Sequence, residues 1–495
     1  MYVSYIFTYH PATVADCCDG GRRVTIDMLP DVALLEIFDC HVKQAREGGE
    51  PHEIQEWHTL VHVCRQWRTI VLGSPRRLDL RLFCTDKTPV KETLAVWPPL
   101  PIVIRQCSEY SEETRPEMDN IIVALEHKDR VCQIELLEVS NSQLEEVVAA
   151  MQQPFPALTD LAILLSDWEE EMPPVVPESF LGGSAPRLQY LYLERIPFRG
   201  LPKLLLSTTD LVSLDIWKIP HSGYFSPEAI VCCLSTLTRL ESLWLGFASP
   251  LSRPVRVNRS LHPPTRSTLL ALTSFCFRGV SEYLEDLVAR IDAPLLDNLD
   301  IRFFHQLIFD TPRLAQFLVR TPTIQPPVAV RITFFDRHVE VTYPPSPPIK
   351  FNLAISCRQT DWQLSSLTQV LSSSFPDAFI LTVEHLYLCE DELWEPKEDD
   401  IEDGQWLEVL RPLTAVKDLY LSREFASCIV PALRELAGEV LSSLQNIFLE
   451  DPHPSGPVQE AIEKFVAARQ LANHPVAVSR WGREQDESTD SEVDD

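Results

Sequence analysis

Glycine is scarce in this chain of 495 residues, with 15 present, and the glycine-rich phosphate-binding loops are missing. No glycine precedes a lysine, so no P-loop can form, and no GxGxxG motif follows a predicted strand. The HExxH and GxSxG motifs of metalloproteases and α/β-hydrolases are missing too. These absences argue against nucleotide-dependent and hydrolytic chemistry, and we expect a protein that is not an enzyme and carries no cofactor or metal.

Paired cysteines, an excess of basic residues and long hydrophobic runs are also lacking. The 13 cysteines include no CxxC pair, which argues against a disulfide framework or a zinc site and favours a reducing compartment. The net charge of -29, from 43 basic and 72 acidic residues, repels nucleic-acid phosphates and anionic lipids. No run approaches the roughly 18 apolar residues that span a bilayer. We expect a cytoplasmic or nuclear protein that binds neither nucleic acid nor membrane.

Two amphipathic helices are predicted near the N-terminus. Pro30 stands where a first helical turn tolerates proline, and apolar residues recur at helical spacing through residues 28–43. A second helix is predicted over residues 57–71, and Gly73-Ser74-Pro75 ends it. Two short helices cannot bury their own apolar faces, so this pair needs a third surface. Capping the following domain is one role that would provide it.

The identities of these residues resemble the F-box pattern over residues 27–82. Leu29-Pro30 is followed by Leu34-Leu35 and Ile37-Phe38, and Val63-Cys64 is followed by Trp67. The resemblance implies a module that docks on the small Skp-type adaptor of a cullin-based ubiquitin ligase. The adaptor contacts that it implies are Leu29, Pro30, Leu34, Ile37, Phe38, Val63, Cys64 and Trp67. The polar link between the helices is longer than is usual in that family.

A pattern L-x-x-L-x-L, with Val, Ile or Phe also allowed at the apolar positions, repeats through the rest of the chain. Its ten copies begin at residues 131, 158, 188, 211, 240, 272, 296, 383, 416 and 444. Apart from one gap of 87 residues, successive copies are 23 to 33 residues apart, close to the period of leucine-rich repeats. Helical stretches between the copies predict one strand and one helix per unit.

The predicted fold is therefore α/β, with a small helical module followed by an irregular leucine-rich-repeat solenoid over residues 83–470. Its curved parallel sheet would carry helices on the convex side. The asparagine that usually follows each strand is missing. In the long gap, residues 328–334 and 338–343 alternate like the strands of a hairpin, and residues 350–371 resemble a degenerate repeat.

Insertions and tails interrupt or flank the predicted solenoid. Residues 249–267 form a proline-rich basic insertion, and residues 389–405 an acidic one. Each insertion is either a solvated loop or a binding site for an oppositely charged surface of a partner. Residues 1–26 and the acidic residues 471–495 are predicted to be disordered tails.

The binding surface follows from strand geometry, because side chains between the inward leucines point outward along the concave face. Aromatic residues favour partner contacts there, although they also favour strands for structural reasons. The predicted contacts with a substrate protein are Tyr190, Tyr192, Asp215, Trp217, Trp244, Asp300, Arg302, Tyr387, Tyr420 and Phe448.

The sequence as a whole predicts a substrate-recognition subunit of a Skp/cullin/F-box ubiquitin ligase. Its partners would be the Skp-type adaptor, the cullin ligase and a protein substrate that the sequence does not identify. A leucine-rich-repeat scaffold without a role in ubiquitin transfer is the alternative, and it would share every feature of the solenoid.

Overall fold

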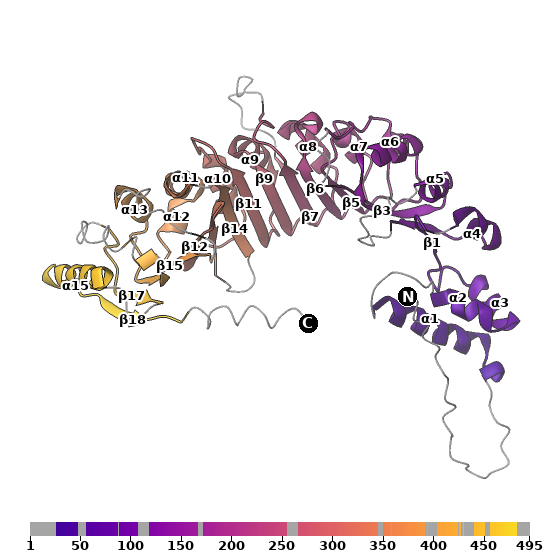
Figure 1. Ribbon diagram of the computed structural model, residues 1–495, viewed down its shortest axis with the longest axis horizontal. Helices are drawn as coiled ribbons and strands as arrows, with labels where there is room; N and C mark the ends of the chain where they lie inside the picture. The colour runs from indigo at the N-terminus through magenta and orange to yellow at the C-terminus, as the bar shows by residue number, and fades with distance from the viewer. Residues whose placement is uncertain are drawn as a thin grey trace, which may run out of the picture. The chain divides into compact units, whose positions relative to one another are not determined.

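The computed structural model divides the chain into two compact units, residues 1–82 and 83–495. It describes residues 26–47, 56–87, 89–106, 118–166, 172–254, 266–344, 350–357, 359–391, 394, 403–423, 425–426, 429, 440–450 and 456–482. The first unit is helical and the second is built on one large sheet (Figure 1).

In the described part of the first unit, a short 3-10 turn is followed by three helices, α1 (Asp31–Glu47), α2 (Glu56–Val63) and α3 (Arg65–Gly73). The prediction of one continuous helix over residues 57–71 is wrong, because the backbone of Cys64 is extended. The Cys64 Sγ accepts the Trp67 N–H at 3.5 Å and caps α3, a local bond that competes with helix continuation. The Arg68 guanidinium donates to the Val61 carbonyl at 2.9 Å, near the end of α2.

The helical unit has a core of its own. Leu34 and Phe38 of α1 and Val61 of α2 are fully buried, and the rings of Phe38 and Trp67 lie 4.7 Å apart. The Trp57 indole is also buried, and its N–H donates to the Arg81 carbonyl at 3.2 Å. The three helices thus bury one face of α1 against the other two.

The described residues of the second unit form a sheet of 16 strands, which is mostly parallel. In spatial order the strands are β1 (Leu82–Cys84), β2 (Ile102–Arg105), β3 (Val131–Val139), β4 (Asp160–Leu165), β5 (Tyr190–Glu194), β6 (Ser213–Ile219), β7 (Ser242–Phe247), β9 (Ser274–Gly279), β11 (Asn298–Phe304), β14 (Lys350–Ser356), β13 (His338–Thr342), β12 (Ala329–Phe334), β15 (His385–Glu390), β16 (Asp418–Leu421), β17 (Asn446–Leu449) and β18 (Ala477–Arg480). All ten repeat motifs form strands of this sheet, as predicted.

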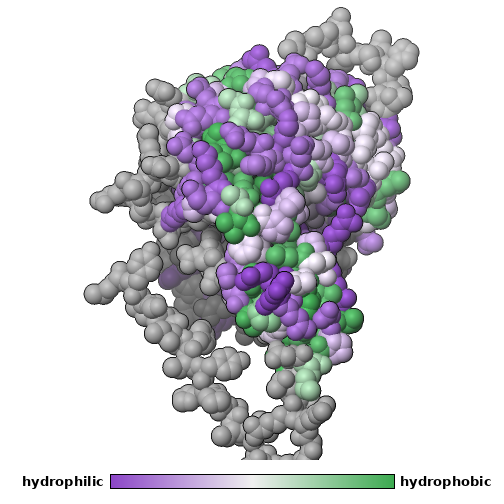
Figure 2. Space-filling model, turned by 90° about the vertical axis from the view of Figure 1, so that its right-hand side faces the viewer, coloured by the Kyte–Doolittle hydropathy of each residue, from purple (hydrophilic) through white to green (hydrophobic). Residues whose placement is uncertain are grey.

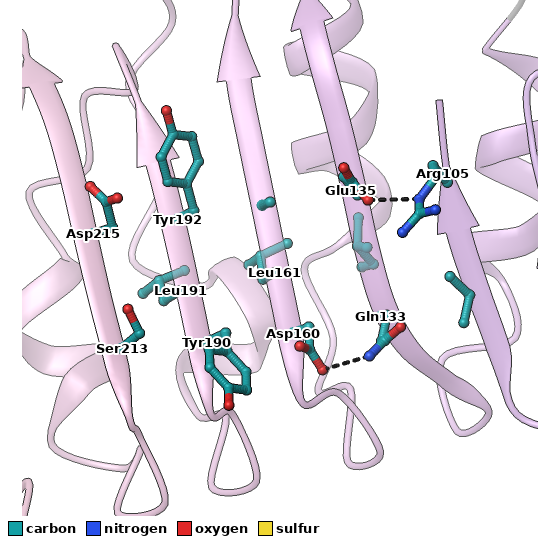
Figure 3. Close-up of a pocket in the computed structure, with 13 residues that line it drawn as sticks. Arg105, Gln133, Glu135, Asp160, Leu161, Tyr190, Leu191, Tyr192, Ser213 and Asp215 are labelled. Atoms are coloured by element: carbon teal, nitrogen blue, oxygen red, sulfur yellow. Dashed lines mark hydrogen bonds and ion pairs between the residues drawn. The ribbon is translucent and has the colours of Figure 1, made fainter. Parts of the chain in front are cut away.

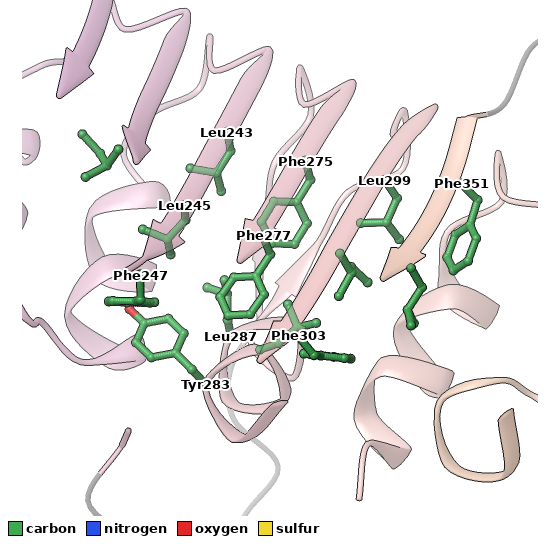
Figure 4. Close-up of a cluster of buried hydrophobic side chains, with 14 of the residues drawn as sticks. Leu243, Leu245, Phe247, Phe275, Phe277, Tyr283, Leu287, Leu299, Phe303 and Phe351 are labelled. Atoms are coloured by element: carbon green, nitrogen blue, oxygen red, sulfur yellow. The ribbon is translucent and has the colours of Figure 1, made fainter. Parts of the chain in front are cut away.

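Helices connect the strands and lie along one side of the sheet (Figure 1). They are α4 (Val90–Val96), α5 (Asp119–Leu125), α6 (Asn141–Ala150), α7 (Leu201–Leu205), α8 (Pro227–Leu234), α9 (Ser281–Val288), α10 (Pro312–Arg320), α11 (Thr360–Ser374), α12 (Asp377–Ile380), α13 (Asp403–Leu410) and α15 (Gly456–Leu471). The ladder residues of the strands are buried, and bulky aromatic rings fill the middle of the core (Figure 4). Phe277 is fully buried there, 5.9 Å from the ring of Tyr283.

The predicted hairpin in the long gap is present, but it changes the order of the strands. β12 and β13 pair antiparallel, and β13 also pairs antiparallel with β14. β14 then pairs parallel with β11, and β12 with β15. The chain therefore fills this part of the sheet in reverse order. β14 lies next to β11 and is followed by α11, so residues 350–371 supply a strand and a helix to the solenoid, as predicted for a degenerate repeat.

The C-terminal end of the sheet extends beyond the predicted solenoid. Residues 471–495 were expected to form a tail, yet β18 pairs parallel with β17. All four side chains of β18 are exposed, so the strand lacks the alternation that would reveal it in the sequence. A second small pairing joins β8 (Ser267–Thr268), at the end of the basic insertion, to β10 (Ile291–Asp292).

Candidate partner-binding face of the sheet

The strand registers align the outward side chains into rows that run across the sheet. The longest row contains Arg105, Glu135, Ala162, Tyr192, Asp215, Trp244, Cys276, Asp300, Asn352, Thr342, Arg331, Tyr387, Tyr420, Phe448 and Ser479. Seven of the ten predicted substrate contacts belong to it. We call the face that carries this row the strand face.

The other three predicted contacts lie on the strand face as well. Tyr190 precedes the row by two residues in β5, and Trp217 and Arg302 follow it by two residues in β6 and β11. None of the ten belongs to the buried core, and Tyr190 and Trp244 are the most exposed, at 47% and 37%. The fold therefore brings all ten residues to one face.

A pocket of about 380 Å³ opens on the strand face over β2 to β6 (Figure 3). Its lining residues are Val103, Arg105, Gln133, Ile134, Glu135, Asp160, Leu161, Ala162, Tyr190, Leu191, Tyr192, Ser213 and Asp215. Sequence reasoning found only the two tyrosines and Asp215. The polar lining residues of β2, β3 and β4 also occupy outward strand positions. The alternation of inward and outward residues therefore signals them in the sequence, but the prediction favoured aromatic residues.

Two carboxylates of this pocket have partners within it. The Arg105 guanidinium lies 2.7 Å from the Glu135 carboxylate in an ion pair. The Gln133 amide donates to the Asp160 carboxylate at 3.0 Å (Figure 3). Asp160 also accepts the Thr159 hydroxyl. These contacts offset the desolvation of both carboxylates within the pocket.

A bulge in β6 supplies the partner of a third carboxylate. Lys218 has a φ of 49°, where the register between β6 and β7 shifts, so Ile219 returns to the core while Lys218 stays outside. The Lys218 ammonium lies 2.7 Å from the Glu194 carboxylate. The Tyr192 hydroxyl donates to the same carboxylate, and burial together with this bond raises the pKa of Tyr192.

Asp215 differs from these carboxylates because it has no hydrogen bond or ion pair with any residue that the structure describes, and no dashed contact reaches it in Figure 3. Burial, with a smaller contribution from Glu194, raises the pKa of Asp215 to about 6. Tyr192 and Trp244 flank it on the neighbouring strands. The result is a carboxylate between aromatic residues and without a cation of its own.

The indole of Trp217 is held against β7 beside this carboxylate. Gly246 permits the close approach, because a Cβ at this position would lie 2.5 Å from the Trp217 ring. The rings of Trp217 and Trp244 meet edge to face, with their centroids 6.1 Å apart. This contact fixes two of the aromatic residues that surround Asp215.

The middle of the strand face is basic. The Arg278 guanidinium lies over the rings of Trp217 and Phe304, at 6.0 and 5.6 Å, and Arg331 lies 5.6 Å from the ring of Tyr387. Within the described residues, neither of these arginines nor Arg302 forms an ion pair. The face thus changes from acidic over β3 to β6 to basic over β9 to β12.

The aromatic residues at the C-terminal end form a stack. Tyr387 and Tyr420 are parallel, with centroids 4.2 Å apart, and Phe448 continues the stack at 4.5 Å from Tyr420. Trp481, which follows β18, packs on both tyrosines and is buried, with 6% of its surface exposed. The chain itself therefore covers part of this stack, and sequence reasoning missed Trp481 because no repeat motif contains it.

The implied adaptor contacts fall into two groups. Leu34 and Phe38 are fully buried in the helical unit, so their assignment as contacts with another protein is wrong in the folded unit. Their position at i and i+4 of α1 makes them the core stripe of that helix. The rest are exposed (Pro30, Ile37 and Val63) or half-buried (Leu29, Cys64 and Trp67).

Further apolar side chains of the helical unit are exposed. Met28 and Val32 are 55% and 67% exposed, and Ile26 is 47% exposed. Figure 2 shows hydrophobic side chains (green) among hydrophilic ones (purple) over the surface in that view. The structure describes none of residues 1–25, 255–265, 395–402 or 483–495, so most of the predicted tails and insertions lie outside the described residues.

Comparisons with known proteins add little to this description. No protein-family model matches the chain, and no curated protein matches it. One similar solved structure is the leucine-rich repeat-containing protein LegL7 from Legionella pneumophila, at 15% identity and a TM-score of 0.24, covering 68% of this chain and 90% of that chain. A similarity at this level supports no conclusion about this chain. Its own strands and helices define the structural class, a leucine-rich-repeat-like α/β solenoid. None of the described helices is long and apolar enough to span a membrane.

Proposed function

We propose that this protein is a two-part receptor for ubiquitin transfer. The strand face of the solenoid binds a protein substrate, and the helical unit docks on the Skp-type adaptor of a cullin ligase. The observation that carries the proposal is the continuous row of outward side chains, which joins polar, charged and aromatic residues from β2 to β18. A surface of this length suits a protein partner better than a small molecule.

The composition of the strand face supports a binding role. Tyr190 and Trp244 are large, exposed aromatic residues, the type that contributes most energy at protein interfaces. Acidic and basic stretches follow each other along the same face, and such a charge pattern selects a complementary partner and fixes its register.

The helical unit supports the adaptor half of the proposal through its exposed apolar residues. Ile37 and Val63 are 46% and 57% exposed, although Leu34 and Phe38 complete a core beneath them. Because the unit already buries its own core, additional exposed apolar side chains are typical of an interaction site.

The double variant Ile37→Asp/Val63→Asp tests this half. We expect it to reduce binding of the purified Skp-type adaptor at least tenfold, because each change places a charge where the interface would exclude water. Binding is measured by titration of the full chain with adaptor. Circular dichroism of the variant should match that of the wild type, since both side chains are exposed.

The matched control places the same charges on the strand face. Tyr190→Asp/Trp244→Asp should leave adaptor affinity unchanged and abolish capture of substrate proteins. If the wild-type chain does not bind the adaptor, the ligase role is excluded and a leucine-rich-repeat scaffold is the function that remains.

A further inference from the structure

Asp215 on the strand face is a carboxylate without a compensating cation among the described residues. Glu135 has Arg105, Glu194 has Lys218, and Asp160 accepts two hydrogen bonds. Asp215 is half-buried and has neither a cation nor a donor among the described residues. A buried, uncompensated carboxylate is costly, so a partner supplied from outside would stabilise it.

The surroundings of Asp215 indicate which chemical group would fit. Tyr192 on β5 and Trp244 on β7 flank it in register, and the two strands are about 9–10 Å apart because each spacing is about 4.8 Å. Trp217 stands two residues further along β6. Aromatic faces attract cations, and a planar guanidinium both stacks on rings and donates two parallel hydrogen bonds to a carboxylate.

We propose that the Asp215 site, formed by Asp215, Tyr192, Trp217 and Trp244, binds an arginine side chain of the partner protein. The inference rests on the proposed function and specifies its substrate class: a segment that presents an accessible arginine. The net charge of -29 would steer such a basic segment toward the protein. Arg278 lies over the Trp217 ring but forms no ion pair or hydrogen bond with Asp215 in the described chain, so the carboxylate stays available to an arginine of the partner.

The site would respond to pH. Asp215, with a pKa of about 6, is ionised at pH 8 and mostly protonated at pH 5, whereas a guanidinium stays charged throughout. The neighbouring charged and titratable groups are Glu194 and Tyr192 from β5, Lys218 from β6 and Cys276 from β9. Burial raises the pKa values of Tyr192 and Cys276, so both stay neutral in this range. Affinity for arginine should therefore fall about tenfold from pH 8 to pH 5.

The probe is N-acetyl-arginine amide, titrated into the full chain and followed by tryptophan fluorescence. We expect saturable binding with a Kd in the millimolar range, as suits one side chain, and at least tenfold weaker binding to Asp215→Asn. The neutral isostere N-acetyl-citrulline amide should not bind, and N-acetyl-lysine amide should bind more weakly. Asp377→Asn, with the same change of charge at an exposed position of helix α12 and outside the strand face, should bind like the wild type.

Equal binding of the citrulline and arginine probes by the wild type would overturn the proposal without any variant. Unchanged affinity of Asp215→Asn for the arginine probe would also overturn the proposal. Tighter binding of the lysine probe than of the arginine probe would overturn the assignment to arginine. The two proposals can be tested apart from each other. If the arginine probe does not bind but strand-face variants still lose their protein partner, the arginine site is excluded and the proposed function is not.

Discussion

Phe277→Ala is expected to lower the free energy of unfolding of the solenoid by about 3–5 kcal/mol, the usual cost of removing a fully buried ring. Phe277 packs against Tyr283, and a Cβ added at Gly279 would lie 2.7 Å from its ring, so the site is tightly filled (Figure 4). Because each repeat is stabilised by its neighbours, the cavity weakens adjacent units as well. Urea unfolding followed by circular dichroism measures the change.

Tyr190→Ala is the control for this prediction. Its side chain is 47% exposed on the strand face, so the loss should stay below about 1 kcal/mol. Similar losses in the two variants would contradict the assignment of Phe277 to the core and of Tyr190 to the surface.

Phe38→Ala is expected to destabilise the helical unit by about 3–5 kcal/mol, because Phe38 is fully buried. Its ring lies 4.7 Å from that of Trp67, and this contact joins α1 to α3. Hydrogen exchange of the full chain, read by mass spectrometry on peptides of α1, measures the loss as faster exchange.

Ile37→Ala is the matched control, one residue away on the exposed side of α1. It should leave the exchange of α1 unchanged while weakening adaptor binding. Phe38→Ala should weaken adaptor binding only because it destabilises the helical unit. Protected α1 amides in Phe38→Ala would show that the ring is an interface residue, as the F-box resemblance implies, and would contradict the structural role found here.

The repeat strands could be predicted from the sequence because the leucine pattern combines burial with strict alternation. β2 lacks that signal, since its first three residues, Ile102, Val103 and Ile104, are all buried. β18 lacks it for the opposite reason, since all its side chains are exposed. The break at Cys64 could not be read either, because apolar residues at helical spacing continue across it. The reversed order of β12, β13 and β14 depends on long-range pairing, which no local pattern encodes.

The strand face was predictable in outline and not in detail. Alternation alone places Tyr192, Asp215 and Trp244 outward, and the registers align them. The distinction of Asp215 from its neighbours depends on contacts between strands, such as Lys218 with Glu194, and on the bulge that permits that contact. The covering of Tyr387 and Tyr420 by Trp481 depends on the end of the chain, far away in sequence.

Hydroxyl-radical footprinting can show whether the strand face is the surface that binds a protein partner. The full chain is compared alone and bound to the proteins that co-purify with it. We expect protection of Tyr190 and Trp244 on the strand face, which are 47% and 37% exposed in the isolated chain. Leu206 and Val319, exposed at the C-terminal ends of helices α7 and α10, should react equally in both samples. Protection of Leu206 and Val319 with unchanged oxidation of Tyr190 and Trp244 would contradict the assignment of the strand face as the binding surface.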